Sequence, residues 1–160
     1  MSLHNKKNSK GIGLIEVVVA VAIIVISLTA LAALANFALS IQSHLKQELI
    51  ATNLAVEAME ATAAAKSDNW SIISGLTLGA PYYPVKSGSP LKWTLSAGAE
   101  NINGFSRQVT FAQVNRDSND DIVLSGGTQD PESRKATVLV SWNEKGKNYQ
   151  VSLDSYLMNW

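Results

Sequence analysis

Six residues near the N-terminus, running from Gly11 to Glu16, place one carboxylate at the start of a long apolar run. The run, Val17 to Leu39, contains no charged side chain. A carboxylate packed among apolar helices needs a cation, because an unpaired buried charge is strongly destabilising. The run offers no cation. A cut after Gly11 would supply one, since the freed amine of Ile12 is positively charged at neutral pH.

A second candidate for functional chemistry lies at residues 115–121, which read Asn-Arg-Asp-Ser-Asn-Asp-Asp. Alternate residues carry side-chain oxygens, which are the ligands that Ca²⁺ prefers. A calcium site would use Asn115, Asp117, Asn119 and Asp121. The stretch lacks the glycine and the distal glutamate of an EF-hand, and Asn and Asp are also common in turns. The turn interpretation is favoured, so no cofactor is expected.

Catalytic chemistry has little support in the sequence. His4 and His44 stand alone, and neither belongs to a cluster with metal-ligand spacing. Gly11 and Gly13 do not form a dinucleotide fingerprint. The chain has no cysteine, which excludes disulfides and thiol chemistry. We therefore expect a protein that is not an enzyme.

The apolar run predicts a single membrane-spanning helix. Val17 to Leu39 would be roughly 35 Å long as a helix, enough to cross a hydrocarbon core of about 30 Å. No small-residue cleavage site closes the run, so we expect the anchor to be retained. Lys6, Lys7 and Lys10 precede it, and this lysine bias places the N-terminus in the cytoplasm. Residues after about 40 are then expected outside the cytoplasm.

The segment from Lys10 through Glu16 and the following apolar run resemble the class III signal of type IV prepilins and of type II secretion pseudopilins. The resemblance covers residues 6 to about 40. It implies that a prepilin peptidase cuts between Gly11 and Ile12 and methylates the new N-terminus at Ile12. Glu16 then becomes the fifth residue of the mature chain. We expect Glu16 to act in assembly, because a filament would bring it into a bundle of apolar helices.

This resemblance implies a structural subunit that is inserted in the bacterial inner membrane and then joins a pilus or pseudopilus. Its implied partners are the prepilin peptidase, an inner-membrane assembly platform, membrane lipid and other pilin or pseudopilin subunits. Major pilins of the best-known type carry a proline near Ala33 and a C-terminal disulfide, and this chain has neither. A minor pilin or pseudopilin is therefore favoured.

Two other functions stay open. The first is a pilus-tip adhesin or DNA-uptake pilin, and the second is an unprocessed, single-pass membrane-anchored domain. Formal net charge is zero, and acidic residues slightly outnumber basic ones after His44. The sequence thus lacks the broad basic field that nucleic acid would need.

The positions of glycine and proline show where the helices and strands that carry these residues can begin and end. Neither occurs between Gly13 and Gly75, which predicts one helix from about 13 to 66. The expected domains are a leader (1–11), a helix (12–66, with the span at about 17–39 and an amphipathic stalk beyond it) and a head (67–160). Beyond the span, apolar residues recur at spacings of four and three, which suits packing on a sheet or on neighbouring helices, and packing in the core of the head is favoured: Leu45, Leu49, Thr52, Val56, Met59 and Ala63.

Alternating apolar residues predict strands in the head. One strand contains Leu91, Trp93 and Leu95, and a second contains Val109 and Phe111 before its register shifts, as at a bulge. A hairpin is predicted from two further alternating segments on either side of a turn at 143–148: Val138, Val140 and Trp142, then Tyr149, Val151 and Leu153. We expect an α+β, pilin-like fold with an antiparallel sheet packed on the long helix. Trp142, Tyr156 and Trp160 are expected in the core.

Overall fold

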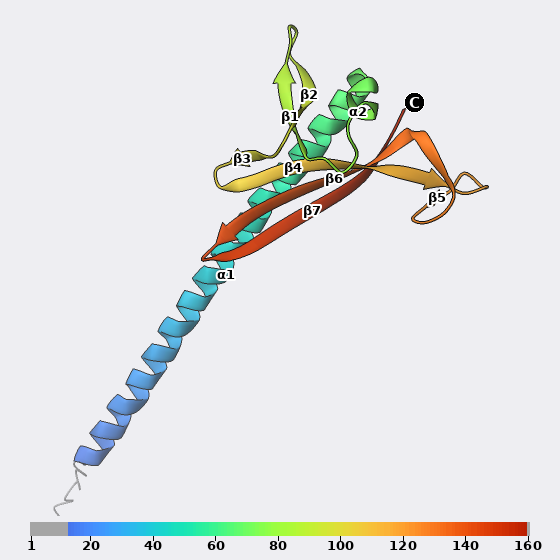
Figure 1. Ribbon diagram of the computed structural model, residues 1–160. Coiled ribbons are helices and arrows are strands. Elements are labelled where there is room, and N and C mark those ends of the chain that lie inside the picture. Colours follow the sequence, from blue (N-terminus) through green and yellow to red (C-terminus); the bar gives the residue numbers. More distant parts are fainter. Residues whose placement is uncertain (1–12, 160) are drawn as a thin grey trace, which may run out of the picture. The chain divides into compact units, whose positions relative to one another are not determined.

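The computed structural model describes residues 13–159, so the expected leader and Trp160 lie outside the described residues. The chain forms two compact units, one ending at Ser43 and one beginning at His44. Helix α1 (Leu14–Asp68) contributes to both units. The second unit also contains α2 (Ser71–Ser74), β1 (Tyr82–Ser87), β2 (Lys92–Ala97), β3 (Glu100–Ile102), β4 (Phe105–Arg116), β5 (Ile122–Val123), β6 (Thr128–Glu144) and β7 (Lys147–Met158) (Figure 1).

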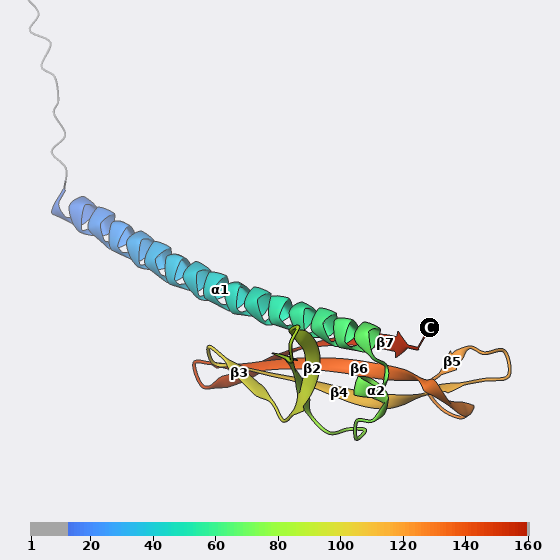
Figure 2. The ribbon, with the colours of Figure 1, turned by 90° about the horizontal axis from the view of Figure 1, so that it is seen from above.

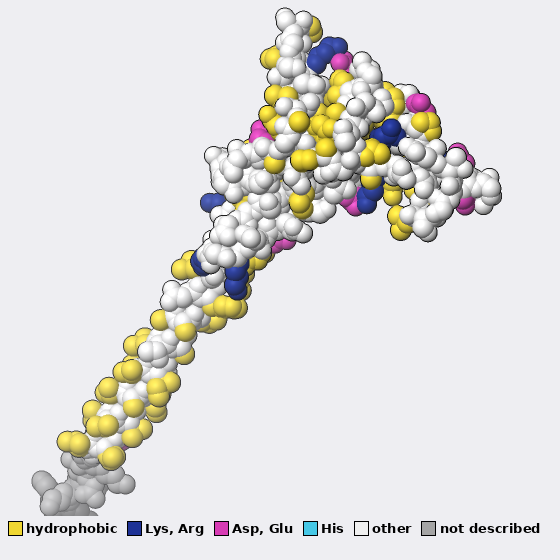
Figure 3. All heavy atoms as spheres, in the orientation of Figure 1, with side chains coloured by type: hydrophobic (Ala, Val, Ile, Leu, Met, Phe, Trp, Pro, Cys, Tyr) yellow, Lys and Arg dark blue, Asp and Glu magenta, His cyan; other side chains and the backbone are white. Residues whose placement is uncertain are grey.

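The first unit is the apolar part of α1. Every residue from 14 to 43 is exposed, including all the large hydrophobic side chains between Leu14 and Ile41. Figure 3 shows these hydrophobic side chains along the helix. By length and composition α1 can cross a membrane, and its most apolar window buries nothing. This surface therefore has no cover within the described chain.

The second unit is built on a seven-stranded antiparallel sheet. Its strand order is β2-β1-β4-β6-β7, with β3 and β5 each paired to β4. Residues 44–68 of α1 lie along one face of this sheet (Figure 2). The β6–β7 turn has only two residues, Lys145 and Gly146, whose φ angles of 51° and 80° are those of a type I′ turn. The register of β4 on β6 shifts between Gln113 and Val114, which confirms the predicted bulge. The α+β, pilin-like fold class is confirmed.

Small side chains of α1 form the contact with the sheet. The buried positions of the helix follow one face and are mostly alanine: Ala51, Ala55, Ala58, Ala61, Thr62 and Ala65. Ala51, Ala55 and Ala58 share a core with side chains of β4 and β6, namely Val109, Phe111, Val138 and Val140. Because the helix side of this contact is built from small side chains, the larger side chains of the strands fill most of the space between helix and sheet.

The predicted stripe was wrong for its first four residues and right for Met59 and Ala63, which pack against the core. Leu45, Leu49, Thr52 and Val56 are exposed, and Met59 and Ala63 are only partly buried. Positions 51, 55, 58, 62 and 65 have the same spacing of four and three but lie on another side of the helix. Trp142 is buried as expected, whereas Tyr156 is 39% exposed and does not belong to the core.

A buried arginine fixes one flank of α1. The Arg107 side chain, from β4, is 3% exposed and forms an ion pair of 2.6 Å with Glu100 of β3. Its other terminal nitrogen donates to the Leu54 carbonyl of α1 at 3.2 Å and lies 3.6 Å from Glu57. A buried guanidinium needs such partners, because an uncompensated buried charge is strongly destabilising. The network therefore holds the Leu54 and Glu57 flank of the helix towards β3.

A second arginine, Arg116 at the end of β4, links β4 to β6 and to the loop that follows β4. Arg116 donates to the Asp130 carboxylate at 2.7 Å and to the Asp120 carbonyl at 2.7 Å. The Ser133 hydroxyl donates to the same Asp130 oxygen at 2.6 Å. Hydrogen bonds from Ser133 and Arg116 hold the pKa of Asp130 below its ordinary value. This network ties the 117–121 loop to β6.

Enlarging the alanine face should destabilise the second unit. We expect Ala55→Leu to lower the free energy of unfolding by about 1–3 kcal/mol, because extra methylenes in a packed core force the helix and sheet apart. The neighbouring change Val56→Leu, at a position that is 40% exposed, is the control and should be nearly neutral. Denaturant unfolding of the full chain in detergent micelles measures both. Equal stability of the two variants would show that α1 does not pack through its alanines.

Removing the Asp130 carboxylate should produce a stability loss that depends on pH. The pKa of Asp130 is lower in the folded chain than in the unfolded chain. Its stabilising contribution is therefore complete above the unfolded value of about 3.9 and disappears as pH falls through the folded value. Asp130→Asn should lower the melting temperature at pH 7, and the difference from the parent should shrink below about pH 4. A difference that stays constant on acidification would contradict this assignment.

Candidate functional site

The candidate site is the start of α1, where the sequence places Glu16. The Glu16 and Val17 amides both donate to the Gly13 carbonyl, at 2.9 and 3.3 Å, and so form the first turn. Glu16 is the acidic residue of this turn and is exposed. Its carboxylate thus lies at the positive end of the helix dipole, which stabilises an anion modestly.

Glu16 forms no ion pair within residues 13–159. The sites predicted to act with it, Gly11 and Ile12, lie outside the described residues, as do Lys6, Lys7 and Lys10. Cleavage between Gly11 and Ile12 therefore stays a prediction. The described geometry is that of an exposed carboxylate at the entrance to an apolar helix, which suits ion pairing.

Two hydroxyls in the apolar run are satisfied by the helix itself. Ser27 donates to the Ile23 carbonyl at 2.8 Å, and Thr29 donates to the Ile26 carbonyl at 2.8 Å. Such back-bonding removes the penalty of exposing an unpaired donor to hydrocarbon. These polar interruptions are therefore compatible with a lipid environment or with a bundle of helices.

The candidate calcium loop is organised as a turn. Asp117 accepts, through one carboxylate oxygen, the amides of Asn119 at 2.8 Å and Asp121 at 3.0 Å. Asn115 donates to the Gly126 carbonyl at 2.9 Å, outside the loop. No three His, Cys, Asp or Glu side chains gather at a metal-binding distance within residues 13–159. The Asp117 hydrogen bonds agree with the favoured turn, and calcium binding remains the untested alternative.

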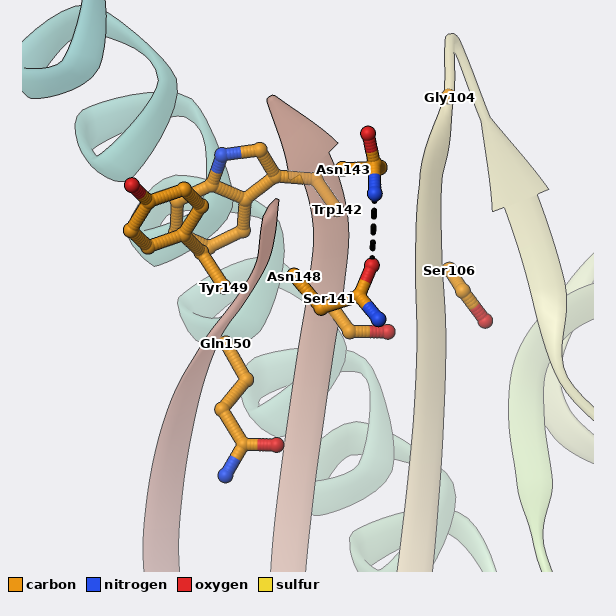
Figure 4. A pocket seen from close by; sticks show the side chains of 8 residues that line it. All are labelled: Gly104, Ser106, Ser141, Trp142, Asn143, Asn148, Tyr149 and Gln150. Carbon is orange, nitrogen blue, oxygen red and sulfur yellow. Dashed lines mark hydrogen bonds between the residues drawn. The ribbon is translucent and has the colours of Figure 1, made fainter. Parts of the chain in front are cut away.

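A hollow of about 480 Å³ lies at the β6–β7 hairpin (Figure 4). It is lined by uncharged residues: Gly104, Ser106, Ser141, Trp142, Asn143, Asn148, Tyr149 and Gln150. Asn143 donates to the Asn148 carboxamide oxygen at 2.8 Å across it. The lining has no carboxylate, imidazole or ammonium group, so it lacks the usual acids and bases of hydrolytic sites.

One contact that the sequence did not indicate joins α1 to the hairpin. His44 lies 2.9 Å from the Glu144 carboxylate and contacts the Tyr149 ring in a tilted arrangement, with ring centroids 4.6 Å apart and an angle of 52° between the planes. The two partners are 100 positions apart in the chain, so no local pattern could have paired them. His44, which stands alone in the sequence, thus has a structural role at the start of the second unit.

Comparison with known proteins agrees with the interpretation of the N-terminal segment. The family model for the prokaryotic N-terminal methylation motif matches residues 6–32, which include Glu16 and the first turns of α1. No curated protein and no solved structure matches the chain. The matched segment and the long apolar helix behind it are therefore consistent with a class III signal of the type IV pilin kind, and the chain carries the prokaryotic N-terminal methylation motif.

Proposed function

We propose that this protein is a structural subunit, a minor pilin or pseudopilin, of a type IV pilus or type II secretion-like filament. It is inserted once in the bacterial inner membrane with its N-terminus in the cytoplasm. A prepilin peptidase cuts it between Gly11 and Ile12 and methylates Ile12. An inner-membrane platform then assembles it with other subunits through its apolar helix. The observation that carries this proposal is the methylation motif at residues 6–32, placed directly on a long uncovered helix.

The exposed helix surface supports assembly through helix contacts. Within the second unit the sheet packs on α1 residues from Ile50 onward, and residues 14–43 of the first unit are all exposed. Lipid covers such a surface while the subunit is in the membrane. Outside the membrane the same area exposed to water would be strongly unfavourable, so helices of neighbouring subunits must replace the lipid.

Glu16 supplies the polar element of this assembly. In a bundle of apolar helices the effective dielectric constant is low, so an ion pair is strong and an unpaired carboxylate is costly. The amine of Ile12, freed by cleavage on the same or a neighbouring subunit, is the cation that matches it. Because the pair forms at one axial position only, it also sets the register at which a subunit joins the filament.

Processing is the first test of this function. The mature protein should begin at N-methylated Ile12, as measured by mass spectrometry of the N-terminal peptide from the membrane fraction. Gly11→Val should block the cut, because a β-branched side chain beside the scissile bond crowds the protease. The smaller change Gly11→Ala is the control and should be cut. An intact N-terminus in cells with active prepilin peptidase would contradict the proposal.

Assembly is tested at Glu16. Glu16→Leu and Glu16→Gln should leave insertion and cleavage intact but lower the amount of subunit in sheared filaments by about tenfold or more, the effect of losing one strong ion pair. Glu48→Leu and Glu48→Gln, at an exposed position of α1 in the second unit, are matched controls that should assemble normally. Quantitative immunoblots of membrane and sheared fractions give the ratio. Parental levels of Glu16→Leu in filaments would exclude a role for this carboxylate.

A further inference from the structure

The β6–β7 turn lies beside the residue at which the second unit begins. This residue, His44, is 2.9 Å from the Glu144 carboxylate, and its ring contacts that of Tyr149 with centroids 4.6 Å apart. Trp142 stacks on Tyr149, with ring centroids 5.7 Å apart. All these contacts lie within the second unit. They hold the hairpin turn next to His44 whatever position the first unit takes.

Covalent geometry keeps His44 close to the apolar segment of α1. The predicted span ends at Leu39, five residues earlier. Five residues rise about 7.5 Å as a helix and reach at most about 18 Å when fully extended. The headgroup layer of a bilayer is about 5–7 Å thick on each side of the hydrocarbon core. If the span crosses a bilayer, His44 and the hairpin turn therefore lie next to the lipid headgroups at any angle between the two units.

Lysines gather at this end of the second unit. Lys46 follows His44 on α1, Lys145 lies in the β6–β7 turn, and Lys147 begins β7. All three lysines are exposed, and Figure 3 shows Lys and Arg side chains where α1 meets the hairpin. Lys46 and Lys147 form no ion pair among residues 13–159. Anionic headgroups attract lysines close to a bilayer, and the flexible stem lets the ammonium group reach them.

The carboxylates of the second unit are distributed differently. Glu144 is 14% exposed and lies against His44, and Glu48 is one turn farther along α1, about 6 Å beyond the level of His44. Other exposed carboxylates surround the loop at the opposite end of β4 (Figure 3): Asp120, Asp121 and Glu132. An anionic surface attracts the lysine-bearing end and repels this loop.

We propose that the basic end of the second unit rests on the anionic lipid headgroups of the bilayer that α1 crosses. The basic end is defined by five residues: His44, Lys46, Lys145, Lys147 and Tyr149. Its lysines bind headgroup phosphates, and its two half-buried rings lie where hydrocarbon gives way to water. The contact depends on the proposed function, since it requires α1 to cross a membrane. It holds the subunit against the membrane until assembly extracts it.

The bilayer suits this surface better than a soluble acidic protein does. The chain itself ties the basic end to the membrane, so the effective concentration of headgroups around the lysines is high. Under that condition a few weak ionic contacts are enough to orient the second unit. A soluble protein would have to bind the same few lysines from dilute solution.

A fluorescent label can report this contact, because the chain has no cysteine and one introduced cysteine takes the label alone. Asn148→Cys places the label beside the hairpin turn, and Ser118→Cys places it in the loop that follows β4. The full chain is reconstituted into vesicles of phosphatidylcholine and phosphatidylglycerol that contain a lipid with a nitroxide on its headgroup. We expect strong quenching at position 148 and weak quenching at position 118. In vesicles of phosphatidylcholine alone, quenching at position 148 should fall to the level of position 118.

Variants of the chain test the lysines. The double change Lys46→Gln and Lys147→Gln should lower the ratio of docked to undocked second units about 25-fold, which is about fivefold for each lysine. Lys66→Gln combined with Lys86→Gln is the matched control. It removes the same charge from the last turn of α1 and from β1, and it should leave quenching at position 148 unchanged.

A separate label, on Ala30→Cys, reports insertion through quenching by lipid with a nitroxide on its acyl chain. Quenching at position 30 without quenching at position 148 would overturn the headgroup contact and leave the proposed function standing. Absence of quenching at position 30 would contradict both. Equal quenching at position 148 in phosphatidylcholine alone, or no loss in the Lys46 and Lys147 double variant, would show that anionic lipid does not hold this end and would also overturn the proposal.

Discussion

Close contact between the alanine face of α1 and the sheet decides which surfaces of the second unit remain free. Because Ala51, Ala55 and Ala58 occupy the contact, the strands supply the bulk of the core through side chains such as Phe111 and Val138. The larger side chains of α1 are displaced to its flanks. One flank is closed by the Arg107 network, and the leucine and valine side chains at positions 45, 49 and 56 stay exposed.

Much of the fold follows from local patterns in the sequence. The absence of glycine and proline between Gly13 and Gly75 predicts the long helix, and alternation on either side of a glycine-containing turn at 143–148 predicts the β6–β7 hairpin. The face of α1 that meets the sheet was not predictable in this way. Leu49 and Val56 belong to the stripe with the larger apolar side chains, but the alanines at 51, 55 and 58 are the buried residues. Which face of the helix packs on the sheet depends on the assembled core, to which residues far apart in the chain contribute.

For the candidate site too, some residues could be identified from the sequence and others could not. Glu16 is recognisable from sequence because a single carboxylate at the start of an apolar run is rare and expensive to bury. The structure places it in the first turn of α1, without an ion-pair partner among residues 13–159. The pairings of His44 with Glu144 and of Arg116 with Asp130 could not be predicted, because tertiary packing alone brings these residues together. A local motif therefore identifies the segment that assembles, while long-range contacts shape the unit that it carries.

In the proposed filament, helices of other subunits replace the lipid that surrounds the apolar part of α1 in the membrane. The most direct measurement is photo-cross-linking from a benzophenone-bearing phenylalanine placed at Leu28, which is 60% exposed. In filaments sheared from cells, the account predicts adducts that mass spectrometry maps to the N-terminal helix of another subunit. A chain that is absent from the sheared fraction, or that forms adducts only with lipid there, would contradict the claim.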